Sequence, residues 1–106
     1  MAKNMLSNLM KQAQQMQERV KQLQEEAAGQ TVEASSGGGM VTVVANGRQE
    51  VLSITIDPSV VDPSDIEMLQ DLVAAAVNEA VRKSQDLMKD EMSKLTAGMG
   101  LPPGLL

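Results

Sequence analysis

The sequence predicts an α+β fold in which a long helix, a three-stranded antiparallel sheet and a second long helix follow one another (α-β-β-β-α). Three observations predict it. Apolar residues recur every three or four positions over residues 2–28, the spacing becomes strand-like over residues 30–56, and helical spacing returns from residue 66. The 106 residues suit one domain. We expect that domain to span residues 1–97, with a flexible tail over residues 98–106.

The first helix is predicted over residues 2–28, because its apolar residues are separated by alternating steps of three and four. These residues are Leu6, Leu9, Ala13, Met16, Val20, Leu23 and Ala27. Gly29 is expected to cap the helix. A helix with one narrow apolar seam is unstable alone in water, so it must pack on another helix.

Three short strands are predicted next, over residues 31–36, 40–45 and 51–56. The run Gly37–Gly39 is interpreted as a flexible connection between the first two. Asn46 and Gly47 form the two-residue signature of a type I′ hairpin turn. Three strands alone are marginally stable, so helices or a second sheet must cover them.

The second helix is expected to open at Asp62, as N-cap, with Pro63 at the first helical position and Asp65 at capping-box spacing. A broad apolar face runs from Ile66 to residue 81 and thins at residues 82–84. We expect a bend there, or the point at which the helix leaves the globular body. Gly98 and Gly100 are expected to end it.

The composition excludes several kinds of chemistry. The chain has no Cys and no His, which excludes disulfides, thiolate nucleophiles, zinc fingers and Ser-His-Asp catalysis. It has no Phe, Trp or Tyr, which excludes aromatic base-stacking platforms. No Ser, Thr or Lys has an evident activating partner. Asp57, Asp62 and Asp65 lie close together in the sequence, but a turn followed by a helix cap accounts for all three. We therefore expect no enzyme, cofactor, metal site or small-molecule substrate.

The chain is also expected to lie in the cytoplasm without a membrane segment. No stretch approaches the about 20 apolar residues that a membrane span needs. The first residues lack the continuous apolar core of a signal peptide.

The net charge of −5 is unevenly distributed. Residues 1–24 carry four basic residues against one acidic, residues 25–81 one against ten, and residues 82–106 four against three. Local patches decide where a polyanion docks, so the two basic ends are candidate phosphate-binding regions. The candidate phosphate-binding residues are Lys11, Arg19, Lys21, Arg82, Lys83, Lys89 and Lys94. The alternative is that these side chains form an ordinary solvated surface of mixed charge.

A homodimer is predicted from the apolar content. Without aromatic residues the core consists of smaller side chains, which stabilise a short chain poorly as a monomer. The two helices also present more apolar surface than one three-stranded sheet can cover.

Five segments carry a family resemblance by their order and spacing. They are residues 8–18 (NLMKQAQQMQE), 39–47, 56–59 (IDPS), 67–76 (EMLQDLVAAA) and the ending over 98–104 with its Leu-Pro-Pro-Gly. Together they resemble the YbaB/EbfC family of bacterial nucleoid-associated proteins. The resemblance implies a homodimer with helices that protrude like tweezers. It also implies a cytoplasmic, nucleoid-associated protein that binds double-stranded DNA and influences gene expression.

The main hypothesis is thus a homodimeric protein that binds DNA phosphates with little sequence preference. The alternative is a helical protein–protein interaction module whose DNA contact is incidental, since the heptad seam and the nine methionines also suit a protein partner. A subunit or regulator of an enzyme is a weaker hypothesis.

Overall fold

A computed structural model describes residues 2–98 and confirms the predicted α-β-β-β-α order. The elements are α1 (Ala2–Ala28), β1 (Thr31–Ser36), η1 (Gly37–Gly39), β2 (Val41–Asn46), β3 (Val51–Ile56), η2 (Pro58–Val60) and α2 (Ile66–Gly98). The predicted flexible tail over residues 98–106 lies, apart from Gly98 at the end of α2, outside the described residues.

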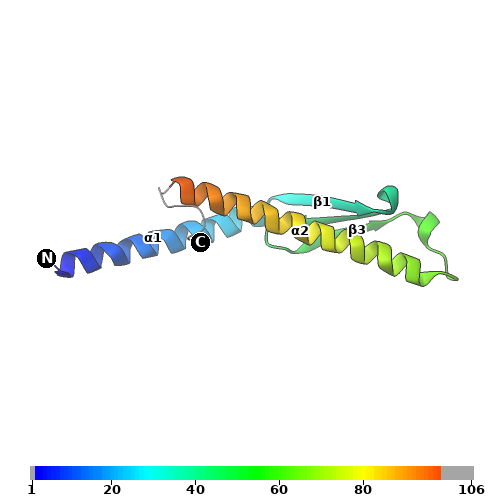
Figure 1. Ribbon diagram of the computed structural model, residues 1–106, viewed down its shortest axis with the longest axis horizontal. Coiled ribbons are helices and arrows are strands. Elements are labelled where there is room, and N and C mark those ends of the chain that lie inside the picture. Colours follow the sequence, from blue (N-terminus) through cyan, green and yellow to red (C-terminus); the bar gives the residue numbers. More distant parts are fainter. Residues whose placement is uncertain (1, 99–106) are drawn as a thin grey trace.

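The molecule is elongated, with extents of 75 × 21 × 18 Å and a radius of gyration of 20.1 Å. A compact domain of this length has a radius of gyration of about 13 Å. The excess comes from the helices. α1 projects away from the sheet, while α2 crosses the sheet and then continues beside the C-terminal half of α1 in the opposite direction (Figure 1).

The core lies between α2 and one face of the sheet. The strands are antiparallel in the order β1-β2-β3, with β2 in the centre. The buried cluster consists of Ala34, Val41, Val43, Ala45, Ala76 and Ala80. Because Ala76 and Ala80 are so small, the α2 backbone approaches the sheet closely. The core is therefore thin, as the aromatic-free composition predicts.

Strand β3 is left largely uncovered, because α2 lies over β1 and β2. Ile54 pairs with the fully buried Val43 and so points to the same side of the sheet, yet it is 45% exposed. Val51 and Leu52 are 40% and 54% exposed. The outer edge of β3 is also free of strand partners within the described chain.

The hairpin between β2 and β3 differs from the predicted type I′ turn. The Gln49 N–H donates to the Asn46 carbonyl at 3.1 Å, and the residue in the left-handed region is Gln49, with φ of 63°, not Gly47. Gly47 is needed for a different reason. Its N–H donates to the Ala27 carbonyl at 2.8 Å, and a Cβ at Gly47 would lie 2.8 Å from the Ala27 Cβ. The glycine therefore permits close contact with α1.

The start of α2 also differs from the prediction, because the helix begins at Ile66 with Asp65 as its cap. Asp65 Oδ1 accepts the Met68 N–H at 3.2 Å. Asp62 Oδ1 instead accepts the Ser64 N–H at 2.9 Å and the Ser64 hydroxyl at 2.7 Å, forming a separate turn. These hydrogen bonds hold the pKa of the exposed Asp62 carboxyl below its usual range.

The glycine run and the middle of α2 were also addressed by predictions. The run Gly37–Gly39 connects β1 to β2 as expected, and it forms a single turn in which all three residues have positive φ. α2 continues through residues 82–84 as one helix, and beyond them it leaves the sheet (Figure 1). No helix among residues 2–98 has both the length and the apolar character that a membrane span requires.

Candidate nucleic-acid interface

The seven predicted basic residues occupy two different environments. Five lie on what we call the arms, which are α1 and residues 85–98 of α2. They are Lys11, Arg19, Lys21, Lys89 and Lys94. Arg82 and Lys83 lie on the part of α2 that covers the sheet.

The three candidates on α1 are exposed and take part in none of the ion pairs formed within residues 2–98. Arg19 lines a recess of about 320 Å³ between the arms, together with Leu95 of α2. Lys11 and Lys21 are ten positions apart, which corresponds to about 15 Å along the helix axis. The cations of α1 are thus spread along one arm.

The two candidates on the α2 arm are also accessible. Lys89 is exposed and belongs to none of the ion pairs in the described part of the chain. Lys94 Nζ lies 3.5 Å from Glu91 Oε1, but the Lys94 side chain is 75% exposed. An exposed pair of this kind holds its partners only weakly, so the Lys94 ammonium can still reach an external anion.

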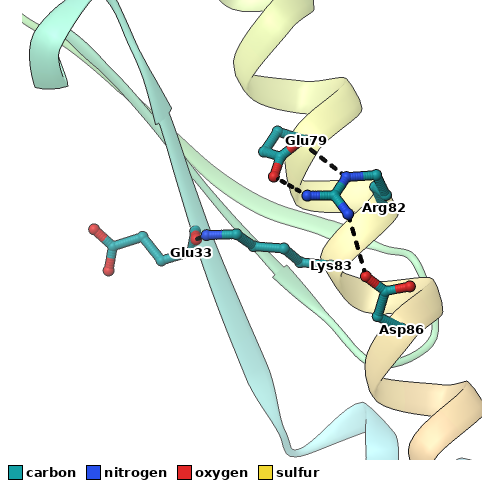
Figure 2. A network of polar contacts seen from close by, with 5 residues as sticks. All are labelled: Glu33, Glu79, Arg82, Lys83 and Asp86. Carbon is teal, nitrogen blue, oxygen red and sulfur yellow. Dashed lines mark hydrogen bonds and ion pairs between the residues drawn. The ribbon is translucent and has the colours of Figure 1, made fainter.

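Arg82 and Lys83 are engaged within the protein (Figure 2). The Arg82 guanidinium contacts both carboxylate oxygens of Glu79, and Arg82 Nη1 lies 3.4 Å from Asp86 Oδ2. The hydrogen bonds from Arg82 hold the pKa of the Glu79 carboxyl below its usual range. Lys83 Nζ donates to the main-chain carbonyl of Glu33 at 2.8 Å and so fastens α2 to β1. The structure therefore does not bring all seven candidates together.

The arms are held at their base by the hairpin turn. Ser84 is fully buried, and its hydroxyl donates to the Asn46 carbonyl at 2.6 Å and accepts the Gln49 N–H at 3.0 Å. On the other side, Gly47 bonds to Ala27 near the end of α1. The same turn thus fixes both arms to the sheet.

Ser84 is a positioning residue that the sequence did not predict, because in the sequence it only interrupts the apolar face of the helix. One signal could have identified it. Ser84 continues the helical spacing of Val77, Ala80 and Leu87, so a polar residue stands at a core position. A buried hydroxyl requires a hydrogen-bond partner from a neighbouring element.

The predicted heptad seam of α1 is covered only in part. Ala27 is buried, and Met16, Val20 and Leu23 are partly buried where the arms run together. Nearer the N-terminus the apolar side chains are 57–69% exposed, and these are Met5, Leu6, Leu9 and Met10. The arm therefore carries an apolar row as well as basic residues.

The described residues contain no group of three carboxylates positioned to hold a metal ion. The arms carry ammonium, guanidinium and amide groups interspersed with six carboxylates. The ammonium, guanidinium and amide N–H groups can bind phosphate oxygens by charge-assisted hydrogen bonds.

Sequence comparison relates this chain to a family of known proteins. A model described as the YbaB/EbfC DNA-binding family matches residues 2–99. A nucleoid-associated protein of Acetivibrio thermocellus is 58% identical over 100 residues, which cover 94% of this chain and 88% of that protein. A nucleoid-associated protein of Syntrophobacter fumaroxidans is 56% identical over 102 residues, covering 92% of this chain and 93% of that protein.

Structural comparison agrees with the sequence matches. The crystal structure of the uncharacterized protein HP0035 from Helicobacter pylori superimposes with a TM-score of 0.64 at 29% sequence identity. The match covers 74% of this chain and 90% of that chain.

Proposed function

This chain belongs to the YbaB/EbfC DNA-binding family, and on that premise we propose that it binds duplex DNA as a nucleoid-associated homodimer in the bacterial cytoplasm. Its role is to organise the nucleoid or to influence gene expression. The arms bind the phosphate backbone, and binding of this kind carries little sequence information.

One observation carries the phosphate-binding proposal. The cations on the arms are exposed and loosely held, whereas Arg82 and Lys83 beside the sheet are engaged by Glu79, Asp86 and Glu33. To bind a phosphate, Arg82 must give up two carboxylate partners and Lys83 its 2.8 Å bond to the Glu33 main-chain carbonyl, whereas Lys94 gives up one exposed pair at 3.5 Å. We therefore expect Lys11, Arg19, Lys21, Lys89 and Lys94 to contribute most to affinity, and Arg82 and Lys83 to contribute less.

The homodimer is proposed from the uncovered side of β3. Val51, Leu52 and Ile54 expose apolar surface beside a free strand edge. Apolar surface in this position is costly to leave in water. A second copy of the chain that covers it would place two pairs of arms on one particle, which increases avidity for a long polyanion.

The test is fluorescence anisotropy of a labelled random duplex at low and near-physiological salt. We expect saturable binding that weakens steeply with salt. The variants Lys11→Gln/Lys21→Gln and Lys89→Gln/Lys94→Gln should each lower the salt slope by about one for every phosphate that is no longer bound. Arg82→Gln/Lys83→Gln removes the same charge and should weaken binding less. Equal reductions in affinity in all three variants would reject the assignment to the arms.

A second candidate function is a helical protein-interaction module. The exposed row that includes Leu6 and Leu9 on α1 favours it. The discriminating result is a folded protein that fails to bind any duplex at low salt. A stoichiometric partner that is retained after nuclease treatment and released in Leu6→Gln/Leu9→Gln would then support this function.

A further inference from the structure

The hairpin turn between β2 and β3 is held rigidly at the base of the arms. Asn46 Oδ1 accepts the Arg48 N–H at 2.9 Å and the Glu50 N–H at 3.1 Å. Gly47 is bonded to α1, and Gln49 is bonded to Ser84 of α2. The backbone on both sides of Arg48 is therefore fixed by hydrogen bonds to the sheet and to both helices.

The Arg48 side chain, in contrast, is exposed and uncommitted. It takes part in none of the ion pairs or side-chain hydrogen bonds formed within residues 2–98. The nearest carboxylate in the sequence, that of Glu50, accepts a hydrogen bond from Asn46 Nδ2 at 2.9 Å. Arg48 is also the one basic residue among residues 25–81, which carry ten acids.

Arg48 lines a recess of about 270 Å³ where the turn meets both arms. The other lining residues are Gln24 of α1, Gly47 and Gln49 of the turn, and Met88 of α2. Gln49 Oε1 accepts Gln85 Nε2 at 3.3 Å, which leaves the NH₂ group of Gln49 available as a donor. The recess thus combines one guanidinium with amide donors from two elements and contains no carboxylate in its lining.

We propose that Arg48, assisted by Gln24 and Gln49, binds a phosphate of the DNA backbone at the base of the arms. The proposal rests on the proposed DNA binding and adds a phosphate site whose guanidinium lies on neither arm. A guanidinium offers several donors in a fixed plane and binds phosphate in a bidentate manner. Because the turn is already immobilised, phosphate binding has to order only the side chain of Arg48. The entropic cost of binding is therefore low.

The site is continuous with the cations of α1. Lys21 lies three residues before Gln24, so the two side chains share one face of the helix. A strand of the duplex that follows α1 past Lys21 reaches the recess one helical turn later. Arg48 would then fix where the backbone enters between the arms.

The experiment compares Arg48→Gln with Gln70→Glu in the same anisotropy titration of a random duplex. Both substitutions change the charge by one unit, but Gln70 is exposed near the N-terminal end of α2, far along the helix from the arms. We expect Arg48→Gln to weaken binding about tenfold, as for the removal of a charged hydrogen-bond partner. The slope of log K against log salt should fall by about 0.9 for each phosphate that Arg48 neutralises. Gln70→Glu should change affinity less than about twofold and leave the slope unaltered.

Each possible outcome bears on the proposal. A wild-type slope in Arg48→Gln would overturn the proposal for Arg48 alone, while the DNA binding of the arms would stand. Equal reductions in affinity in Arg48→Gln and Gln70→Glu would also overturn it, because only overall charge would then matter. A wild-type protein that binds no duplex at low salt would overturn the proposed function and this site together. Arg48→Lys, which retains the charge without the planar donor set, should recover the slope and only part of the affinity.

Discussion

Replacing Ser84 with alanine tests whether the hairpin turn holds the arms to the sheet. The Ser84 hydroxyl donates to the Asn46 carbonyl at 2.6 Å and accepts the Gln49 N–H at 3.0 Å, and Ser84→Ala removes both bonds. Neither backbone group becomes entirely unsatisfied, because Gln49 N–H also donates to the Asn46 carbonyl at 3.1 Å. The cost is therefore that of two net hydrogen bonds, about 1–3 kcal/mol of unfolding free energy, and not two full desolvation penalties.

Urea unfolding followed by circular dichroism at one fixed protein concentration measures this cost. The matched control is Ser93→Ala, since Ser93 is exposed on the same helix. That change should leave stability unaltered or raise it by about 0.3 kcal/mol, because alanine has the higher helix propensity. A Ser84→Ala protein within about 0.3 kcal/mol of the wild type would refute the role of the turn, since removal of even one net hydrogen bond exceeds this value.

Three further changes test other parts of the molecule. Gly47→Ala should lower the unfolding free energy by about 2–3 kcal/mol in the same urea assay, because its Cβ would meet Ala27 backbone and side chain at 2.8 Å; an unaltered midpoint would contradict the close approach of the turn to α1. Arg82 keeps the folded-state pKa of Glu79 below 4.5, so the pair contributes stability above this pH and loses it as the pH falls through the lower folded value. Glu79→Gln should therefore flatten the acid side of the stability profile, and an unaltered profile would show that the pair contributes nothing measurable. Ile54→Asp should convert the proposed homodimer into a folded monomer in light scattering, and a retained dimer mass would place the interface elsewhere.

Local patterns in the sequence were sufficient to predict most of the fold. The apolar spacing correctly predicted both ends of α1 and both ends of β3. The start of α2 could not be chosen in the same way, because Asp62 and Asp65 are equally good caps by residue type. The choice is made by Ser64, whose N–H and hydroxyl both bind Asp62, and this leaves Asp65 to accept from the helix.

The hairpin shows why a local signature can fail. Asn46 and Gly47 alone predict a type I′ turn, in which both central residues have positive φ. The observed turn is set instead by α1, since Gly47 must donate to Ala27, twenty positions earlier in the chain. That hydrogen bond depends on where the first helix ends relative to the sheet, which no pattern near residue 47 encodes.

The contacts of the candidate site also differ in whether the sequence alone can predict them. Arg82 and Glu79 are three residues apart on one helix, so their ion pair follows from spacing. The bond from Lys83 to the Glu33 carbonyl joins positions fifty residues apart and follows only from the packing of α2 on β1. Basic residues could thus be found from the sequence, but which of them are already engaged is a property of the tertiary structure.

The geometry also explains how a protein of net charge −5 can bind a polyanion. The acids are concentrated in residues 25–81, which form the end of α1, the sheet and the part of α2 that covers it. At physiological ionic strength the screening length is about 8 Å, whereas the molecule is 75 Å long. Residues 2–28 and 85–98, which form the arms, carry six basic and six acidic residues, so the arms are close to neutral while the body around the sheet is acidic. A duplex on the arms would therefore be influenced mainly by the charges of the arms, and the acidic body would repel DNA that approaches the sheet. The same separation makes Arg48 informative, because it is the one cation of the acidic segment and lies where that segment meets the arms.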